Sequence, residues 1–353
     1  QSAMNNCIEI DYIADTYAYQ IDCGKLVKFL HDNCKKICNY IQSDVKTVIK
    51  IEDDIEKIIL EDGSEITGDL FIDCTGWNQL LIGGDDNIDL SDRLFIDSAL
   101  AARVKYEDPK TEMHPYTDCQ AMEHGWRWRI PTRSRIGTGY CFNRTITDPD
   151  TVAQAFSEHW NGRIKPDEMR LLDWKPQYVK SFWDGNVVPI GLSAGFIEPL
   201  ESTSLFNTGH GILALVKILN EGKLGRFARE RFNKDISDHM DGWKEFVEAH
   251  YYYSQRRDTP YWSELTEDIH YSGGAHDVVS DIMVHTHEVD HGKDPILFIL
   301  AGHGHTCVDT RKDEFFNERP IVPNVSRWWE RRGKISKSEF PTMFSYLAQR
   351  FSI

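Results

Sequence analysis

The chain carries at residues 187–204 the sequence VVPIGLSAGFIEPLESTS. The apolar residues at the start of this segment predict a strand. After the segment, apolar residues recur with the period of a helix, and Gly222 marks the predicted end of that helix. A strand, an irregular loop and a helix form the junction where α/β proteins hold ligands, because the first amides of the helix are unpaired and carry positive potential. Residues 195–204 also hold two acids, Glu198 and Glu201, and three hydroxyls. We therefore expect a functional site at this junction.

The composition excludes several classes of protein. At 353 residues the chain is long enough for two domains or one large α/β unit. Lys and Arg number 40 against 56 Asp and Glu, and the net charge of −16 repels nucleic-acid backbones and anionic lipid. No apolar run approaches the roughly 18 residues of a spanning helix, and no signal-peptide pattern opens the chain. We expect neither nucleic acid nor membrane as a partner.

Cysteine and histidine spacing argues against a metal site. Eight cysteines are scattered without a CxxC pair, which favours reduced thiols in a cytoplasmic compartment over a disulfide framework or a zinc site. His285, His287 and His291 match neither a helical HExxH pair nor a zinc finger. We interpret them as part of a solvated loop and expect no metal.

The chain divides into a β-rich half and a helical half. Asp22 is a candidate N-cap of a first helix. Strand-type sequence then covers residues 45–51, 56–60, 69–74, 93–106 and 126–142. From about residue 150 the pattern is helical, interrupted at 187–204. We expect an α/β (α+β) fold, with the central sheet in residues 1–204 and a mainly helical part in 205–353, packed together without a linker.

A strand at residues 125–131, GWRWRIP, carries two indoles beside each other. Strand alternation sends alternate side chains to opposite faces, and a proline ends the ladder. One face then holds Trp126, Trp128 and Ile130, the other holds Arg127 and Arg129, and Pro131 is the terminator. By composition alone, a cross-strand aromatic core explains these residues better than a ligand-facing wall does, but the WxWxIP spacing is rare enough to act as a signature.

Two other segments are candidates for ligand contact. Residues 69–76, DLFIDCTG, bring Thr75 and Gly76 to the end of a buried strand, where a ligand can approach the backbone closely. An ordinary strand exit is the alternative. Residues 249–262, AHYYYSQRRDTPYW, gather aromatic rings around two arginines and an acid, a mixture that can sandwich a planar ring. A helix end docked on a core is the alternative here.

Taken together, these segments resemble the flavin-dependent tryptophan halogenase family. The matching pieces are the strand ending at residues 73–76, the aromatic motif at 126–131, the junction at 191–203 and the segment from His250 to Trp262. Their order and approximate spacing agree from roughly residue 17 to at least 265. The combination is specific, although no single piece is.

The resemblance implies a fold and a chemistry. The fold would be an FAD-binding module of the aromatic-hydroxylase type, with a mainly helical substrate module packed against it. Reduced FAD, delivered by a separate flavin reductase, would use O2 to oxidise a halide ion to hypohalous acid. That acid would travel to a lysine beside a small aromatic substrate, where electrophilic substitution occurs.

The resemblance also assigns residues to roles. Glu201 would be the catalytic carboxylate near the lysine, and Thr203 and Ser204 would hold the halide. Contacts to the cofactor would come from Thr75, Gly76, Gly191, Leu192 and Ser193. A wall between flavin and substrate would consist of Trp126, Trp128, Ile130 and Pro131. The substrate would be bound by Tyr251, Tyr252, Arg257, Tyr261 and Trp262.

Three departures from the family pattern qualify this assignment. The GxGxxG fingerprint and the catalytic lysine lie upstream of the matched region, and the opening residues, QSAM, resemble a cut into a longer protein. Ser204 stands where the family usually has glycine, which leaves the choice of halide open and favours a weakly hydrated, easily oxidised one. Arg257 stands where tryptophan halogenases have an acid, so an indole or phenol fits better than free tryptophan.

Two other functions remain open from the sequence. One is a flavin-dependent monooxygenase that hydroxylates its substrate directly, and the indole wall argues against it. The other is a non-catalytic flavin-binding relic, because no lysine in this chain can be assigned. A homo-oligomer is compatible with everything in the sequence.

Overall fold

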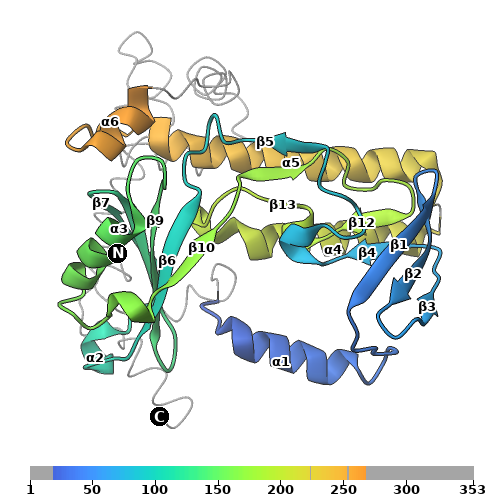
Figure 1. The fold of residues 1–353 in the computed structure, drawn as a ribbon, viewed down its shortest axis with the longest axis horizontal. Coiled ribbons are helices and arrows are strands. Elements are labelled where there is room, and N and C mark those ends of the chain that lie inside the picture. Colours follow the sequence, from blue (N-terminus) through green and yellow to red (C-terminus); the bar gives the residue numbers. More distant parts are fainter. Residues whose placement is uncertain (1–18, 223, 253, 268–353) are drawn as a thin grey trace, which may run out of the picture.

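The computed structural model describes residues 19–222, 224–252 and 254–267 (Figure 1). The α-helices are α1 (Cys23–Cys34), α2 (Pro109–Glu112), α3 (Pro149–His159), α4 (Thr203–Glu221), α5 (Arg226–Tyr252) and α6 (Pro260–Glu267). Short 3-10 helices are η2 (Gly76–Asn78), η3 (Pro166–Glu168), η4 (Gly191–Ser193) and η5 (Leu200–Ser202). The strands are β1 (Val45–Ile51), β2 (Asp54–Leu60), β3 (Glu65–Ile66), β4 (Phe71–Asp73), β5 (Asn87–Asp89), β6 (Ser98–Val104), β7 (Asp118–Met122), β8 (Gly125–Pro131), β9 (Ile136–Phe142), β10 (Arg170–Asp173), β11 (Gln177–Val179), β12 (Val187–Pro189) and β13 (Gly195–Phe196).

Most of the predicted elements of the first half are confirmed. The carboxylate of Asp22 accepts a hydrogen bond from the Lys25 amide and caps α1. The region expected as strand at 126–142 forms two strands, β8 and β9, joined by a turn in which the Thr132 amide donates to the Arg135 carbonyl. The edge strand β7 follows no clear alternation in the sequence and forms because β8 supplies its partner.

The helical expectation after residue 150 is wrong between residues 170 and 179. Here β10 pairs with β6, and β11 pairs with both β5 and β13. These strands are only four and three residues long, which is too short for a two-residue period to stand out from a helical one. Pairing with distant strands decides their conformation.

The five-stranded antiparallel sheet has the strand order β10-β6-β9-β8-β7 and separates two cores. On one face Tyr140 and Phe142 pack with Phe156 of α3. On the other face Trp126 and Cys141 belong to the main core. Figure 1 shows α3 against this sheet and the long helices α4 and α5 beyond its other face. The sheet therefore carries aromatic side chains into two different environments.

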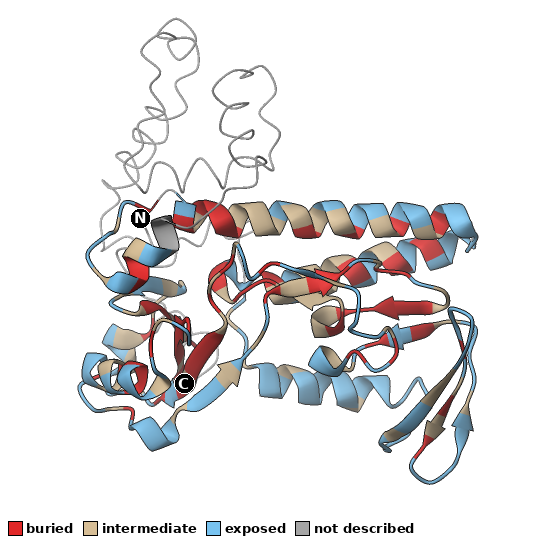
Figure 2. Ribbon diagram, turned by 45° about the horizontal axis from the view of Figure 1, so that its top comes forward, coloured by how far each residue is buried: buried red, intermediate tan, exposed pale blue. Residues whose placement is uncertain are grey.

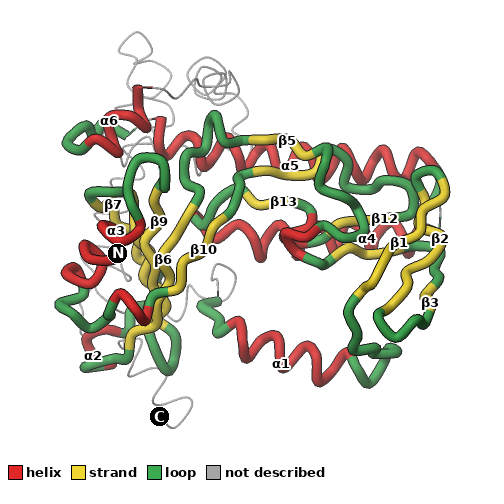
Figure 3. The backbone as a smooth tube through the Cα atoms, viewed as in Figure 1, coloured by secondary structure: helices red, strands yellow, loops and turns green. Residues whose placement is uncertain are grey.

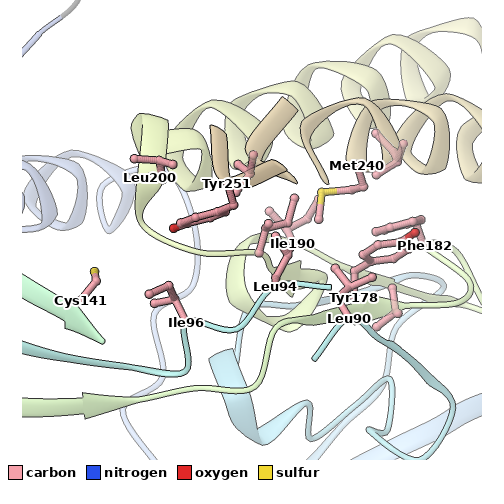
Figure 4. Close-up of a cluster of buried hydrophobic side chains, with 14 of the residues drawn as sticks. Leu90, Leu94, Ile96, Cys141, Tyr178, Phe182, Ile190, Leu200, Met240 and Tyr251 are labelled. Carbon is pink, nitrogen blue, oxygen red and sulfur yellow. The ribbon is translucent and has the colours of Figure 1, made fainter. Parts of the chain in front are cut away.

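The main core joins the sheet to the helices. Leu215 of α4 and Phe232 of α5 are buried in it together with Trp126 of β8. Figure 4 shows Tyr251, Met240 and Ile190 converging in this region from α5 and from the loop after β12. The buried residues of α5 recur along the helix from Ala228 to Tyr251 and are most closely spaced toward its carboxyl end (Figure 2). The β-rich part and the helices thus share one hydrophobic core.

The two strands nearest the predicted site are parallel. β4 pairs with β12, and the chain leaves them at the same end, into η2 after β4 and into η4 after β12. The hydroxyl oxygen of Ser193 in η4 lies 3.2 Å from the Gly76 carbonyl oxygen of η2. Figure 3 shows these loops beside the start of α4. Parallel strands place their carboxyl ends together, which is where open α/β sheets bind ligands.

The helix α4 begins at Thr203 and ends with Gly222 in the left-handed conformation, at φ 67°. Its buried residues include Leu215 and Ile218, whereas Leu213 is 70% exposed. In the described part of the chain no helix is both long and apolar enough to cross a membrane.

Candidate active site

The loop before α4 has an unusual backbone. Glu201 and Ser202 both adopt positive φ, at 63° and 56°, a conformation that residues with side chains rarely take. Ser202 is the N-cap of α4, yet its hydroxyl does not cap the helix. Consecutive left-handed residues cost free energy, and such strain concentrates where geometry serves a function. This observation supports a site at the predicted junction.

Glu201 is paired with a histidine from α5. Its Oε1 lies 3.1 Å from Nε2 of His250, whose Nδ1 lies 2.9 Å from the Phe246 carbonyl oxygen. Both ring nitrogens face acceptors, so a ring that carries protons on both can donate to both. The Glu201 side chain keeps 43% of its surface exposed. The carboxylate is therefore oriented and still accessible.

His250 is a residue that the sequence assignment missed. It lies within the aromatic segment 249–262, in which tyrosines and arginines predominate. A histidine directly before the tyrosine run was the available signal. Its pairing with Glu201 depends on the packing of α5 against the loop.

A small cavity adjoins the start of α4. Its volume is about 30 Å³, enough for one water-sized occupant. Thr203 and Ser204 line it together with Asn207, Thr208 and other residues. Burial, and then the neighbouring His210, lowers the pKa of His239 to about 4, so this lining ring is neutral near physiological pH. Hydroxyls and helix-start amides would thus be the donors to an anion here.

Asp73 organises the loop after β4. It is fully buried, and its oxygens accept hydrogen bonds from the amides of Thr75, Leu81 and Ile82. The hydroxyls of Thr75 and Ser193 also donate to Oδ1, at 2.7 and 3.1 Å. Burial alone would raise the pKa of Asp73, but these hydrogen bonds lower it below 3.8 overall. One carboxylate therefore holds η2 against η4.

The residues expected to contact FAD lie together on these two turns. Gly76 has φ 69° and open space where a Cβ would stand, and Gly191 has φ 70°. Gln79, which the sequence assignment did not include, donates to the Ser193 carbonyl at 2.8 Å and strengthens the same cradle. Leu192 and Ser193 belong to the same turn, η4. Backbone left open by glycines fits the approach of a large flat cofactor.

The two indoles that were expected to form a wall lie beside each other on β8. Trp126 is buried, Trp128 is partly buried, and their ring centroids lie 6.1 Å apart. A Cβ on Gly139 of the neighbouring strand would stand 2.1 Å from the Trp128 ring, so this glycine makes room for the indole. The alternation along β8 is confirmed, and β8 ends at Pro131, one residue after the half-buried Ile130.

The residues expected to bind substrate differ in how far they are buried. Tyr251, Tyr261 and Trp262 are buried in the main core, whereas Tyr252 is 37% exposed. The indole nitrogen of Trp262 donates to the Met122 carbonyl at 2.7 Å. Arg257 donates to the carbonyls of its neighbours at 254 and 256. The segment thus docks on the sheet, and its part in substrate binding stays a prediction.

Tyr251 contacts the other acid of the junction. Its hydroxyl donates to Oε1 of Glu198 at 2.6 Å, and Oε2 of Glu198 has no hydrogen-bond partner among the described residues. Burial raises the pKa of Glu198 to about 8. Near physiological pH this carboxyl is mostly neutral, in contrast to the accessible carboxylate of Glu201. The two acids of one motif therefore have different environments.

Among the described residues, no group of three or more His, Cys, Asp or Glu side chains is placed to hold a metal ion. His285, His287 and His291 lie outside the residues that the structure describes.

Comparisons with known proteins point to one family. The sequence profile of tryptophan halogenases matches residues 8–318. The tryptophan 6-halogenase ThaL of Streptomyces albogriseolus is 33% identical over 257 residues, which cover 70% of this chain and 48% of that protein. The chain spans about half the length of the curated relatives it matches.

Solved structures agree with this result. The VirX1 apo structure superposes with a TM-score of 0.83 at 29% identity and covers 100% of this chain and 74% of that one. BrvH, a flavin-dependent halogenase from Brevundimonas sp. BAL3, gives a TM-score of 0.81 at 25% identity, over 98% of this chain and 74% of its own. The α/β fold is that of flavin-dependent halogenases, and the chain belongs to the tryptophan halogenase family.

Proposed function

We propose that the protein is a flavin-dependent halogenase acting on a small electron-rich aromatic compound. The observation that carries the proposal is the strained turn at Glu201 and Ser202. It joins an accessible, histidine-held carboxylate directly to a small cavity at a helix start. One turn of chain would thus serve both the halide and the substrate.

The cofactor would be reduced FAD, supplied by a separate reductase, and with O2 it would oxidise the halide to hypohalous acid. Thr75, Gly76 and the turn 191–193 would hold it, because Asp73 fixes these backbones side by side. We place the boundary between the FAD-binding module and the substrate module between residues 204 and 205, within the first turn of α4.

Glu201 would act at the substrate end. Its carboxylate can orient the hypohalous acid and accept the proton that the ring loses during substitution. His250 holds one oxygen of the carboxylate and leaves the other available. Trp126 and Trp128 would separate the flavin from the substrate and so prevent direct oxygen transfer.

Arg257 bears on the choice of substrate. ThaL carries the name of a tryptophan 6-halogenase, and an amino acid brings an ammonium group to its binding site. A guanidinium at Arg257 repels that group. We therefore propose an indole or phenol without an ammonium group as the substrate.

Mass spectrometry of the product tests the proposal. The full-length protein should convert indole, in the presence of reduced FAD, O2 and bromide, to a product that has gained bromine. A product that gains oxygen instead would favour the monooxygenase. Absence of any product would favour the flavin-binding relic.

Ser204 should influence the choice of halide. It lines the cavity at the start of α4, and glycine there would remove a hydroxyl and enlarge the space. We expect Ser204→Gly to change the relative rates with chloride, bromide and iodide by about tenfold, the effect of one hydrogen bond to a charged group. Competition assays with paired halides measure this ranking. An unchanged ranking would remove Ser204 from the halide site.

A further inference from the structure

The two acids of the loop before α4 bind consecutive residues at the carboxyl end of α5. Glu201 lies 3.1 Å from Nε2 of His250, and Glu198 accepts a hydrogen bond of 2.6 Å from the hydroxyl of Tyr251. Glu198 precedes Glu201 by three residues, so the two pairs fasten both ends of one short turn. The Glu201 pair is accessible, whereas the Glu198 pair is buried in the main core.

The segment around Glu198 is anchored in the core. Ile197, Glu198 and Leu200 are all buried. The chain turns from the core to the surface between Leu200 and Glu201, where the backbone enters the left-handed conformation. Figure 4 shows Leu200 and Tyr251 within the same buried cluster. A strained turn of this kind persists only when the structure on both sides of it is fixed.

The surroundings of Glu198 offer no positive charge. The titratable groups that face it are Cys141 of β9, Tyr251 of α5 and Tyr261 of α6, and a charge on Glu198 raises the pKa of each. These thiol and phenol groups are neutral at physiological pH. Burial raises the pKa of Glu198 to about 8, and the Tyr251 hydrogen bond opposes this rise only in part. An ionised Glu198 would therefore be a buried charge without a counter-ion among the described residues, which is costly.

We propose that Glu198 and Tyr251 form a proton-dependent latch that seats the Glu201 loop on α5. The neutral Glu198 carboxyl stays in the core and accepts from Tyr251. When it loses its proton, the least costly response is to move the carboxylate into water. Because Glu201 follows three residues later, this movement also separates Glu201 from His250. Glu198 and Tyr251 are thus positioning residues, and the inference rests on the catalytic role proposed for Glu201.

The direction of the pH dependence follows from the raised pKa. The Glu198 carboxyl has an ordinary pKa of 4.5 and one of about 8 in the seated loop. The seated loop therefore binds the proton more tightly than a released loop does, and it is favoured most below pH 4.5. This preference weakens as the pH rises above 4.5 and is lost once the pH exceeds about 8. Glutamine does not titrate, so Glu198→Gln should remove the dependence.

Hydrogen exchange tests the latch without relying on halogenation. Exchange of the peptide 197–203 is followed by mass spectrometry in the full-length protein and in Glu198→Gln. Relative to the variant, exchange in the unmodified protein should rise about tenfold from about pH 7 to about pH 9. Comparing the two proteins at each pH cancels the intrinsic effect of pH on exchange. A ratio that does not change with pH would overturn the latch.

Halogenation should follow the same pattern. The neutral fraction of a carboxyl with a pKa of about 8 falls about tenfold from about pH 7 to about pH 9. We expect the rate of the unmodified protein, relative to Glu198→Gln, to fall by the same factor. A constant ratio of rates would overturn the positioning role. If the unmodified protein forms no halogenated product at any pH, the proposed function fails, and hydrogen exchange alone decides on the latch.

Glu248→Gln is the matched control. Glu248 also lies near the end of α5, is buried, and has a pKa raised to about 7 by burial. Its carboxylate oxygens have no hydrogen-bond partner among the described residues, so it does not fasten the loop. This variant should keep the pH dependence of the unmodified protein in both measurements. If it removed that dependence as Glu198→Gln does, the effect would belong to the core as a whole and the latch would be refuted.

Tyr251→Phe tests the other partner and serves as the second variant if Glu198→Gln does not fold. It deprives the Glu198 carboxyl of its one hydrogen bond among the described residues. At about pH 7 we expect loop exchange to rise and kcat to fall about tenfold, with KM for the aromatic substrate unchanged. A raised KM with unchanged loop exchange would place Tyr251 in substrate binding and overturn its role in the latch.

Discussion

Glu201→Gln should abolish most of the halogenation and leave flavin binding intact. Glutamine keeps the shape of the side chain but cannot take up the proton that the aromatic ring loses. General-base catalysis contributes about a hundredfold to ten-thousandfold in rate, so we expect turnover to fall at least about a hundredfold. Single-turnover assays with reduced FAD and bromide measure the loss, and fluorescence titration measures flavin affinity.

Glu198→Gln provides the matched control from the same loop. The Glu198 carboxyl has a pKa raised to about 8 by burial, so it is mostly neutral at about pH 7. An amide is neutral as well, and its oxygen can still accept the hydrogen bond from Tyr251. We expect Glu198→Gln to retain turnover within severalfold. Equal loss in both variants would show that the loop, and not the Glu201 carboxylate, is responsible.

Local sequence patterns predict the structure correctly where a feature depends on one helix or strand alone. The two-residue period of a strand predicts that Trp126 and Arg127 lie on opposite faces, and they do, because β8 is paired on both sides. Gly222 predicts the end of α4, since glycine accepts the left-handed cap at little cost. These features depend on residues a few positions apart.

Contacts between distant segments could not be predicted in this way. His250 lies 49 residues from Glu201, and His159 lies 32 residues from Arg127. Each pair depends on how a helix packs, and neither residue shows that packing in its own neighbourhood. The two positive φ values at 201 and 202 are likewise hidden, because no glycine marks them. A resemblance to a family can place a motif, but partners such as these require the fold.

The strongest structural effect should come from Asp73→Asn. The carboxylate accepts from Thr75 and Ser193 and from the amides of Leu81 and Ile82. An asparagine would turn an NH2 group toward at least one of these donors, which leaves two buried donors facing each other. We expect a loss of about 3 kcal/mol in the free energy of unfolding, together with weaker flavin binding. Urea denaturation measures the first and fluorescence titration the second.

Asp89→Asn is the control for this variant. Asp89 also accepts from an amide, that of Ser91, but its side chain is 52% exposed and its Lys175 partner lies at the surface. Its replacement should cost less than about 1 kcal/mol. If Asp73→Asn proved no more destabilising than Asp89→Asn, the hydrogen bonds around Asp73 would not be what holds the two turns together.

The contribution of Asp73 to the free energy of unfolding should also depend on pH, and it should decrease only when the pH falls. Its pKa in the folded protein is lower than the ordinary value of 3.8, so its carboxylate stabilises the fold fully above 3.8. As the pH falls through the lower, folded pKa, the group becomes protonated and this contribution disappears. The difference in urea midpoint between the unmodified protein and Asp73→Asn should therefore be constant at neutral pH and narrow only below 3.8. A difference that instead widened as the pH fell from neutral toward 3.8 would mean that the folded carboxyl has a raised pKa, and that burial outweighs the hydrogen bonds holding η2 against η4.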